Sequence, residues 1–351
     1  MKSNYNIHNK YDKLKTVMLG DTYYPEFFDT IKNDKIKSAL QRIAHETQEE
    51  LEYYQKVLKD FGCDVLRPEL DRNDKITNYV GKAGEAKQIV RPPLQPRDAQ
   101  LVIKNHCFIT GTYGKIDNPA IRNELQFYDN EHLVDIIPYG DLTALDAPCF
   151  TLNNNDLWIN DEYGHFEVRV DKSVKGFQLN ILKEYYPNLN IHLLDHEGHS
   201  DGCFAILKEG VILTLNEIQD YERNHPGWDI CTIFDDQTDI AREMKKWGQL
   251  KRNQNSGFWV PGEDDNKEFQ HYVETWLKDW VGWVEESVFD VNVLVLDEHN
   301  VCVSNPNNPL VNAFFKKHKI DAVHIPWRHR FFWDGGLHCI TLDLERESYG
   351  Y

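Results

Sequence analysis

One unit of secondary structure recurs along this chain, in the order hairpin, helix and strand. The hairpins are predicted from alternating apolar residues, and the helices from apolar residues three and four positions apart. Three complete copies are predicted, at 100–110, 119–133 and 135–139, at 156–170, 174–186 and 190–195, and at 291–304, 309–319 and 321–327. A unit of this kind cannot bury its own apolar face, so several copies must close around a common centre.

Two further copies complete the set. A hairpin over 203–215 begins a fourth copy. A strand at 15–19, a long helix at 36–61 and a strand at 63–68 make a fifth. We expect the last predicted strand, 340–344, to close the ring beside 15–19. This organisation predicts an α/β fold with pseudo-fivefold ββαβ repeats.

The same pattern bears on domain organisation. A closed ring of five units makes residues 1–351 a single domain. The irregular copy is the fourth, which is followed by a long, charged, tryptophan-bearing segment at about 237–279. We interpret this segment as an insertion near the pocket.

Composition excludes several classes of protein. The formal net charge of −18 argues against binding to nucleic acid or anionic membranes, which requires clustered lysine and arginine. No window approaches the roughly 18 uninterrupted apolar residues of a membrane span, and the first residues carry no apolar targeting segment. Seven cysteines without a Cys-x-x-Cys pair fit a reducing compartment. We therefore expect a soluble, cytoplasmic protein.

Two short segments carry residues suited to covalent catalysis. Cys339 follows a glycine turn at the head of an apolar run, where a nucleophile would be exposed, and His199 stands two residues before Asp201. A thiolate is the nucleophilic form of cysteine, and a histidine can move the protons of attack and departure. A carboxylate can accept paired N–H groups from a guanidinium. Together these groups predict attack on a cationic carbon of an arginine-like substrate.

The alternative readings of these residues are structural. A lone buried cysteine is more often a small core residue, and a lone aspartate more often caps a turn. Histidines 192, 196 and 199 offer a rough metal-ligand spacing, but no accompanying carboxylate motif supports a zinc site. We predict no metal and no cofactor.

Four segments resemble the amidinotransferases of the guanidino-modifying pentein superfamily, the group that contains arginine:glycine amidinotransferase. Residues 335–339, Gly-Gly-Leu-His-Cys, resemble the nucleophile motif, and His199-Ser200-Asp201 is similar to the motif of the catalytic histidine and a guanidinium-binding aspartate. Pro96-Arg97-Asp98 resembles the segment of a second guanidinium-binding aspartate, and 292–298 resembles a family strand and turn. The resemblance implies a five-bladed β/α propeller and places Asp98, Asp201 and His338 among the substrate-binding residues.

The chain departs from the family pattern at three places. Asn153 stands where an acidic residue is expected behind the histidine, so either Asn153 or Asp156 is expected to orient His199. An amide can orient an imidazole but cannot stabilise imidazolium by charge. Ile218 stands near the family's amino-acid-binding arginine, and Glu285-Glu286 replaces small hydroxyl residues. These two changes predict a preference for a cationic amine.

The resemblance implies amidino transfer. Cys339 attacks the guanidino carbon of a donor such as arginine, His199 protonates the departing amine, and an acceptor amine attacks the amidino-cysteine. The expected partners are this small-molecule donor and acceptor, and the assembly considered is a homodimer. Two alternatives remain: a guanidino hydrolase on the same fold, in which water replaces the amine, and a noncatalytic pentein binding protein.

Overall fold

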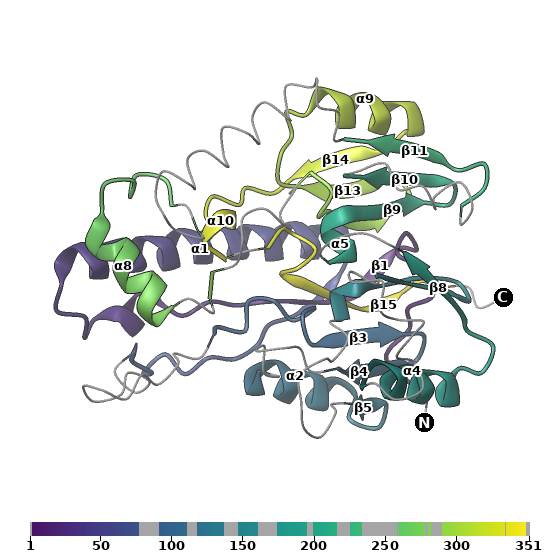
Figure 1. Cartoon of the computed structure of the whole chain (residues 1–351), viewed down its shortest axis with the longest axis horizontal. Helices are drawn as coiled ribbons and strands as arrows, with labels where there is room; N and C mark the ends of the chain where they lie inside the picture. The colour runs from purple at the N-terminus through teal and green to yellow at the C-terminus, as the bar shows by residue number, and fades with distance from the viewer. Residues whose placement is uncertain are drawn as a thin grey trace.

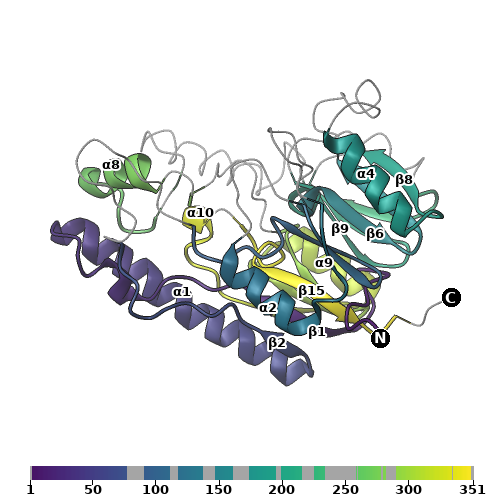
Figure 2. The same cartoon turned by 90° about the horizontal axis from the view of Figure 1, so that it is seen from below.

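The fold is described from a computed structural model, shown from two directions in Figures 1 and 2. The residues described are 2–76, 91–110, 118–136, 147–160, 174–194, 199–215, 225–233, 258, 260–277, 280–281, 290–333 and 335–348. Within this part of the chain, each helix is too short or too polar to cross a bilayer.

The described strands form five three-stranded sheets built on one plan. In each sheet the middle strand is antiparallel to one neighbour and parallel to the other. The first sheet contains β15 (Thr341–Arg346), β1 (Leu14–Leu19) and β2 (Asp64–Leu66), and the second contains β3 (Gln100–Ile103), β4 (His106–Ile109) and β5 (Leu133–Asp135). The third contains β6 (Phe150–Asn153), β7 (Asp156–Asn160) and β8 (Asn190–Leu194), and the fourth contains β9 (Phe204–Lys208), β10 (Val211–Thr214) and β11 (Asp229–Thr232). The fifth contains β12 (Leu294–Asp297), β13 (Asn300–Val303) and β14 (Asp321–His324).

In four of the five sheets a described helix connects the middle strand to its parallel neighbour: α1 (Asp34–Phe61), α2 (Pro119–Asp129), α4 (Val174–Tyr185) and α9 (Pro309–His318). A further helix is α8 (Lys267–Trp276), and the short ones are η1 (Pro25–Phe28), η3 (Ala147–Cys149), α5 (Ser200–Cys203) and α10 (Arg330–Trp333). The side chain of Asn33 caps the start of α1 by accepting from the backbone of Lys35 and Ile36, and Gly62 ends the helix in the left-handed region at φ 101°. Helix α1 runs along one side of the molecule beside α8 (Figure 2).

The predicted position of the last strand beside residues 15–19 is confirmed. Strand β15 pairs antiparallel with β1, from Leu14 opposite Arg346 to Leu19 opposite Thr341. This sheet takes its first strand from the C-terminal part of the chain and its other two from the N-terminal part. The pairing fixes the position of the turn before β15, which carries Cys339.

Two predicted boundaries were wrong. The hairpin predicted at 156–170 begins earlier, because Asn154 adopts φ 58° and allows a tight turn between β6 and β7. The strand predicted at 135–139 also begins earlier: α2 ends at Asp129, and Leu133 already pairs with Cys107. Residues 161–170 and 137–139 lie outside the described part of the chain.

A buried network of charged side chains links the last strand to the segment before β3. Arg97 Nη2 lies 2.6 Å from Asp343 Oδ1, and Arg346 Nε donates to Asp343 Oδ2 at 2.9 Å. Burial alone would raise the pKa of Asp343, but Arg346 and Arg97 outweigh it and hold the pKa well below its usual value. Arg346 also donates to the carbonyl of Val295 at the start of another sheet. This network ties β15 to the segment before β3 and to β12.

Candidate active site

Cys339 lies in a tight turn immediately before β15. The backbone N–H of Ile340 donates to the carbonyl of Gly336, and that of Thr341 donates to the carbonyl of His338. The cysteine side chain is buried, so the exposure expected from the sequence is wrong: the turn packs against Asn292 and Asp201, which cover the sulfur. Both glycines of the turn are packed closely, because a Cβ on Gly336 would lie 2.5 Å from Asn292 Oδ1 and one on Gly335 would lie 2.7 Å from Gln95 Nε2. The glycine motif therefore lets neighbouring side chains reach the turn.

Asp201 joins the histidine and the cysteine of this turn. The carboxylate stands in the first turn of α5, where its Oδ2 accepts a hydrogen bond from His338 Nδ1 at 2.8 Å and lies 3.4 Å from Cys339 Sγ. Its other oxygen, Oδ1, is buried and accepts no hydrogen bond from the described residues. A buried carboxylate oxygen without a donor costs free energy. The site therefore contains an acceptor suited to a cationic N–H group.

The ionisation states of these three groups follow from burial and from one another. Burial would raise the pKa of Asp201, but the hydrogen bond and charge of His338, together with His199, hold it well below its usual value. Burial, followed by the charge of Arg97, lowers the pKa of His338 to about 4. Burial, followed by the charges of Asp201 and Asp98, raises the pKa of Cys339 well above its usual value. Near neutral pH the site combines a carboxylate, a neutral imidazole and a protonated thiol.

The segment Pro96-Arg97-Asp98 lies directly against the turn that carries Cys339. Arg97 Nε donates to the carbonyls of His338 and Thr341, both at 3.0 Å, so this residue holds the turn in place. Asp98 is buried, lies 3.6 Å from Arg91 Nη1, and acts electrostatically on the thiol. Asp201 thus contacts the thiol and Asp98 acts on it electrostatically, while their role in binding a guanidinium stays a prediction.

His199 directly precedes α5 and is half-buried. Its carbonyl accepts from the backbone of Gly202, and the hydroxyl of the adjacent Ser200 donates to the carbonyl of Cys149 at 2.8 Å. Its effect on the pKa of Asp201 places the imidazole within electrostatic range of that carboxylate. His199 and Asp201 therefore lie at the start of the same short helix, and Asp201 contacts the thiol.

The two residues predicted to orient His199 make hydrogen bonds elsewhere. Asn153 Oδ1 accepts from the hydroxyl of Tyr11 at 3.3 Å, and Asp156 Oδ1 lies 2.7 Å from His192 Nε2. Both stand at the hairpin turn, whereas Ser200 contacts Cys149, the residue that precedes β6. Strand geometry separates the two ends of β6 by about 10 Å. The orienting role of Asn153 or Asp156 remains a prediction.

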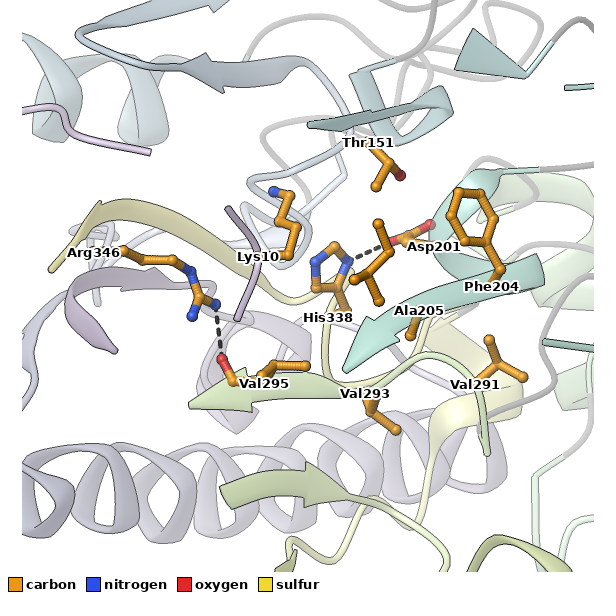
Figure 3. Close-up of a pocket in the computed structure, with 11 residues that line it drawn as sticks. Lys10, Thr151, Asp201, Phe204, Ala205, Val291, Val293, Val295, His338 and Arg346 are labelled. Atoms are coloured by element: carbon orange, nitrogen blue, oxygen red, sulfur yellow. Dashed lines mark hydrogen bonds and ion pairs between the residues drawn. The ribbon is translucent and has the colours of Figure 1, made fainter. Parts of the chain in front are cut away.

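Three residues of the site, Asn292, Thr151 and Lys10, were missed by the sequence reasoning. Asn292 contacts the turn that carries Cys339; in the sequence it opens the family-like segment 292–298, just before a buried apolar strand, but nothing there assigns its side chain to the site. Thr151 lines a cavity of about 30 Å³ together with Lys10, Asp201 and His338 (Figure 3). Figure 3 shows the imidazole of His338 between Lys10 and Asp201. Glu285, Glu286 and Ile218 lie outside the described residues.

Comparison with known proteins places this site on a familiar fold. The sequence matches no family model and no curated protein. The structure is similar to that of SxtG, an amidinotransferase of saxitoxin biosynthesis from Microseira wollei, with a TM-score of 0.66 and 17% identity over 99% of each chain. It is also similar to the inosamine-phosphate amidinotransferase StrB1 from Streptomyces griseus, with a TM-score of 0.64 and 17% identity over 99% of each chain.

A hydrolase shares the fold at a lower similarity. DDAH from Pseudomonas aeruginosa, in complex with citrulline, gives a TM-score of 0.52 and 12% identity over 94% of this chain and 99% of that one. The chain therefore has the α/β fold of these enzymes, and the resemblance predicted from four short segments is confirmed at the level of the fold.

Proposed function

We propose that the protein is an amidinotransferase that moves an amidino group from arginine or a related guanidino donor to an amine. One observation carries this proposal: a buried thiol stands beside Asp201, which has an oxygen without a donor among the described residues, and is influenced by a second carboxylate, Asp98. A planar cation with several N–H donors would satisfy Asp201 Oδ1 and bring its central carbon close to sulfur. The fold shared with two amidinotransferases supports the same reading.

The reaction balances with the groups present. Cys339 passes its thiol proton to His199 as the sulfur attacks the guanidino carbon; the bond from that carbon to the substituted nitrogen breaks, and His199 gives that nitrogen the same proton. The amidino group is then bound to sulfur. An acceptor amine attacks this carbon, passes a proton to His199, and releases Cys339. No redox change occurs.

Substrate binding would also prepare the nucleophile. The carboxylates of Asp201 and Asp98 disfavour the thiolate in the free protein, as the raised pKa of Cys339 indicates. A bound guanidinium would neutralise this negative field, so the pKa of the thiol should fall when the donor is bound. Coupling of this kind would keep the sulfur unreactive until a cationic substrate is in place.

The finer features of the fold belong to the same proposal. The five sheets would be the blades of a β/α propeller that makes residues 1–351 one domain, with an insertion at about 237–279 near the pocket. Within that range, α8 packs beside α1, and Arg42 on α1 contacts Glu263 at 2.8 Å. We further propose a cytoplasmic protein, with a homodimer as the assembly to test.

Isotope-labelled arginine tests the proposed function directly. The protein is incubated with arginine labelled in its guanidino carbon and with glycine, ornithine or putrescine, and products are read by mass spectrometry. We expect the label in a new guanidino compound, with putrescine preferred if Glu285 and Glu286 face the acceptor. Label in a ureido product would identify a hydrolase instead. Binding without any labelled product would favour a noncatalytic protein.

Exchange of acid and amide at the hairpin tests the orienting residue. The described contacts lead us to expect that Asn153→Asp and Asp156→Asn each change kcat by less than about tenfold, because Asn153 faces Tyr11 and Asp156 faces His192. Loss of a group used only in the transition state would instead lower kcat and kcat/KM together. Measurement of both constants for the two variants decides the role. A large loss in one variant would assign the orienting role to that residue.

A further inference from the structure

We propose that Asn292 is a catalytic residue that stabilises the thiolate of Cys339 through its side-chain amide. The inference rests on the proposed role of Cys339 as nucleophile. Asn292 lies just before β12 (Leu294–Asp297), far from the nucleophile in sequence, and is buried at 3% exposure. Its Nδ2 donates to Cys339 Sγ at 3.0 Å, so it contacts the reacting atom itself.

The orientation of the amide is fixed by its neighbours. Oδ1 accepts from the backbone N–H groups of His338 at 2.9 Å and Cys339 at 3.2 Å, and Nδ2 also donates to the carbonyl of Asp201 at 3.1 Å. Rotating the amide by half a turn would set its NH₂ group against two N–H donors and its oxygen against a carbonyl. The network therefore requires an N–H group, and not an oxygen, on the sulfur.

A donor in this position favours one form of the sulfur over the other. A hydrogen bond to an ionised acceptor is roughly twice as strong as one between neutral groups. Asn292 therefore stabilises the thiolate more than the thiol, and opposes the effect of burial and of the carboxylates of Asp201 and Asp98 on the pKa of Cys339. Being neutral, it supplies this donor without adding a cation that would compete with a cationic substrate.

The glycine motif is shaped around this amide. A Cβ on Gly336 would lie 2.5 Å from Asn292 Oδ1 and 2.7 Å from its Cβ. These separations are too short for any larger residue without movement of the turn or of Asn292. The second glycine of the Gly-Gly-Leu-His-Cys segment is thus explained by the close approach of Asn292.

Alkylation of the thiol tests the inference without requiring turnover. The rate of reaction with iodoacetamide is measured against pH for the wild type, Asn292→Asp and Asn292→Ser. Asparagine to aspartate keeps the volume and the acceptor for two backbone N–H groups, but it replaces the donor on sulfur with a negative charge. In the Asn292 variants we expect the midpoint of the pH profile to lie about one pH unit or more above that of the wild type. At a pH below the midpoint, their alkylation rate should therefore be about tenfold lower. Above the midpoint the rates should converge.

A matched control separates this effect from damage to the core. Asn308 is equally buried, and its Oδ1 also accepts from two backbone N–H groups, those of Leu310 and Val311, while its Nδ2 donates to Asp290. Asn308→Asp therefore introduces a similar buried charge away from the thiol, and we expect its alkylation profile to match the wild type.

The outcomes also distinguish this inference from the proposed function. If amidino transfer is measurable, both Asn292 variants should lose kcat more than they change KM. If the Asn292 variants shift the alkylation profile but the protein transfers no amidino group, Asn292 still stabilises the thiolate and the proposed amidinotransferase function is wrong. Unchanged midpoints in Asn292→Ser, whether or not Asn292→Asp folds, would overturn the role of Asn292.

Discussion

Cys339→Ser is expected to abolish turnover and the covalent intermediate together. A serine hydroxyl is much less acidic than a thiol, and burial beside Asp201 would disfavour its ionised form further. We expect a loss of kcat on the order of 10³-fold or more, the scale on which nucleophile removal acts in enzymes that use covalent catalysis. Intact-mass spectra of quenched mixtures with arginine should show one added amidino group on the wild type and none on the variant.

Cys63→Ser provides the control for this substitution. Cys63 is also buried, and its sulfur donates to the carbonyl of Leu14, a hydrogen bond that a hydroxyl can replace. This variant should keep both the adduct and the activity. Retention of activity in Cys339→Ala, or an adduct located on another cysteine by peptide mapping, would contradict the mechanism.

Asp201→Asn is expected to move two measurements in opposite directions. Loss of a buried carboxylate that pairs with a cation costs about 2–5 kcal/mol, so kcat/KM for the guanidino donor should fall roughly 30- to 3,000-fold. The same change removes a negative charge that contributes to the raised pKa of Cys339. The thiol pKa should fall, and alkylation of the free protein at a fixed pH below that pKa should become faster. Steady-state kinetics and the alkylation profile are measured on the same preparation.

Asp129→Asn is the matched control, because Asp129 also accepts from a histidine, His132, whose Nδ1 lies 3.0 Å from Asp129 Oδ1. That pair lies beside α2 and β5, away from the thiol, so neither measurement should change. A fall in both measurements for Asp201→Asn would show that Asp201 acts through the shape of the site rather than through its charge.

The sequence predicts a structural feature well when neighbouring residues determine it, and poorly when the feature depends on contacts between distant residues. The alternation of apolar residues located most of the hairpins, and the predicted pairing of residues 340–344 with 15–19 is confirmed. The hairpin at β6 and β7 was displaced because its turn depends on the left-handed conformation of Asn154, which apolar periodicity does not register.

The site divides in the same way. Cys339 and Asp201 stand in short segments with a family pattern, and the structure places their side chains 3.4 Å apart. Asn292 contributes to the same group through a hydrogen bond that spans 47 positions of sequence, and the segment 292–298 that it opens gives no local sign of this contact. Contacts of this kind depend on how the sheets pack. They become visible only once the chain has folded.

The pairing of β1 with β15 has a consequence for the order in which the molecule assembles. Thr16 on β1 contacts Glu345 on β15 across 329 positions, so β1 is synthesised long before its antiparallel partner. Strand β2 follows β1 through the connection that contains α1, so it can pair with one edge of β1 early. The other edge stays unpaired until β15 has been synthesised. An unpaired edge of an apolar strand favours association with other chains, and contacts this distant in sequence form slowly. The turn that carries Cys339 thus reaches its final position only when this sheet is completed. Until then the candidate active site is not formed, and the unpaired edge of β1 is open to pairing with other chains.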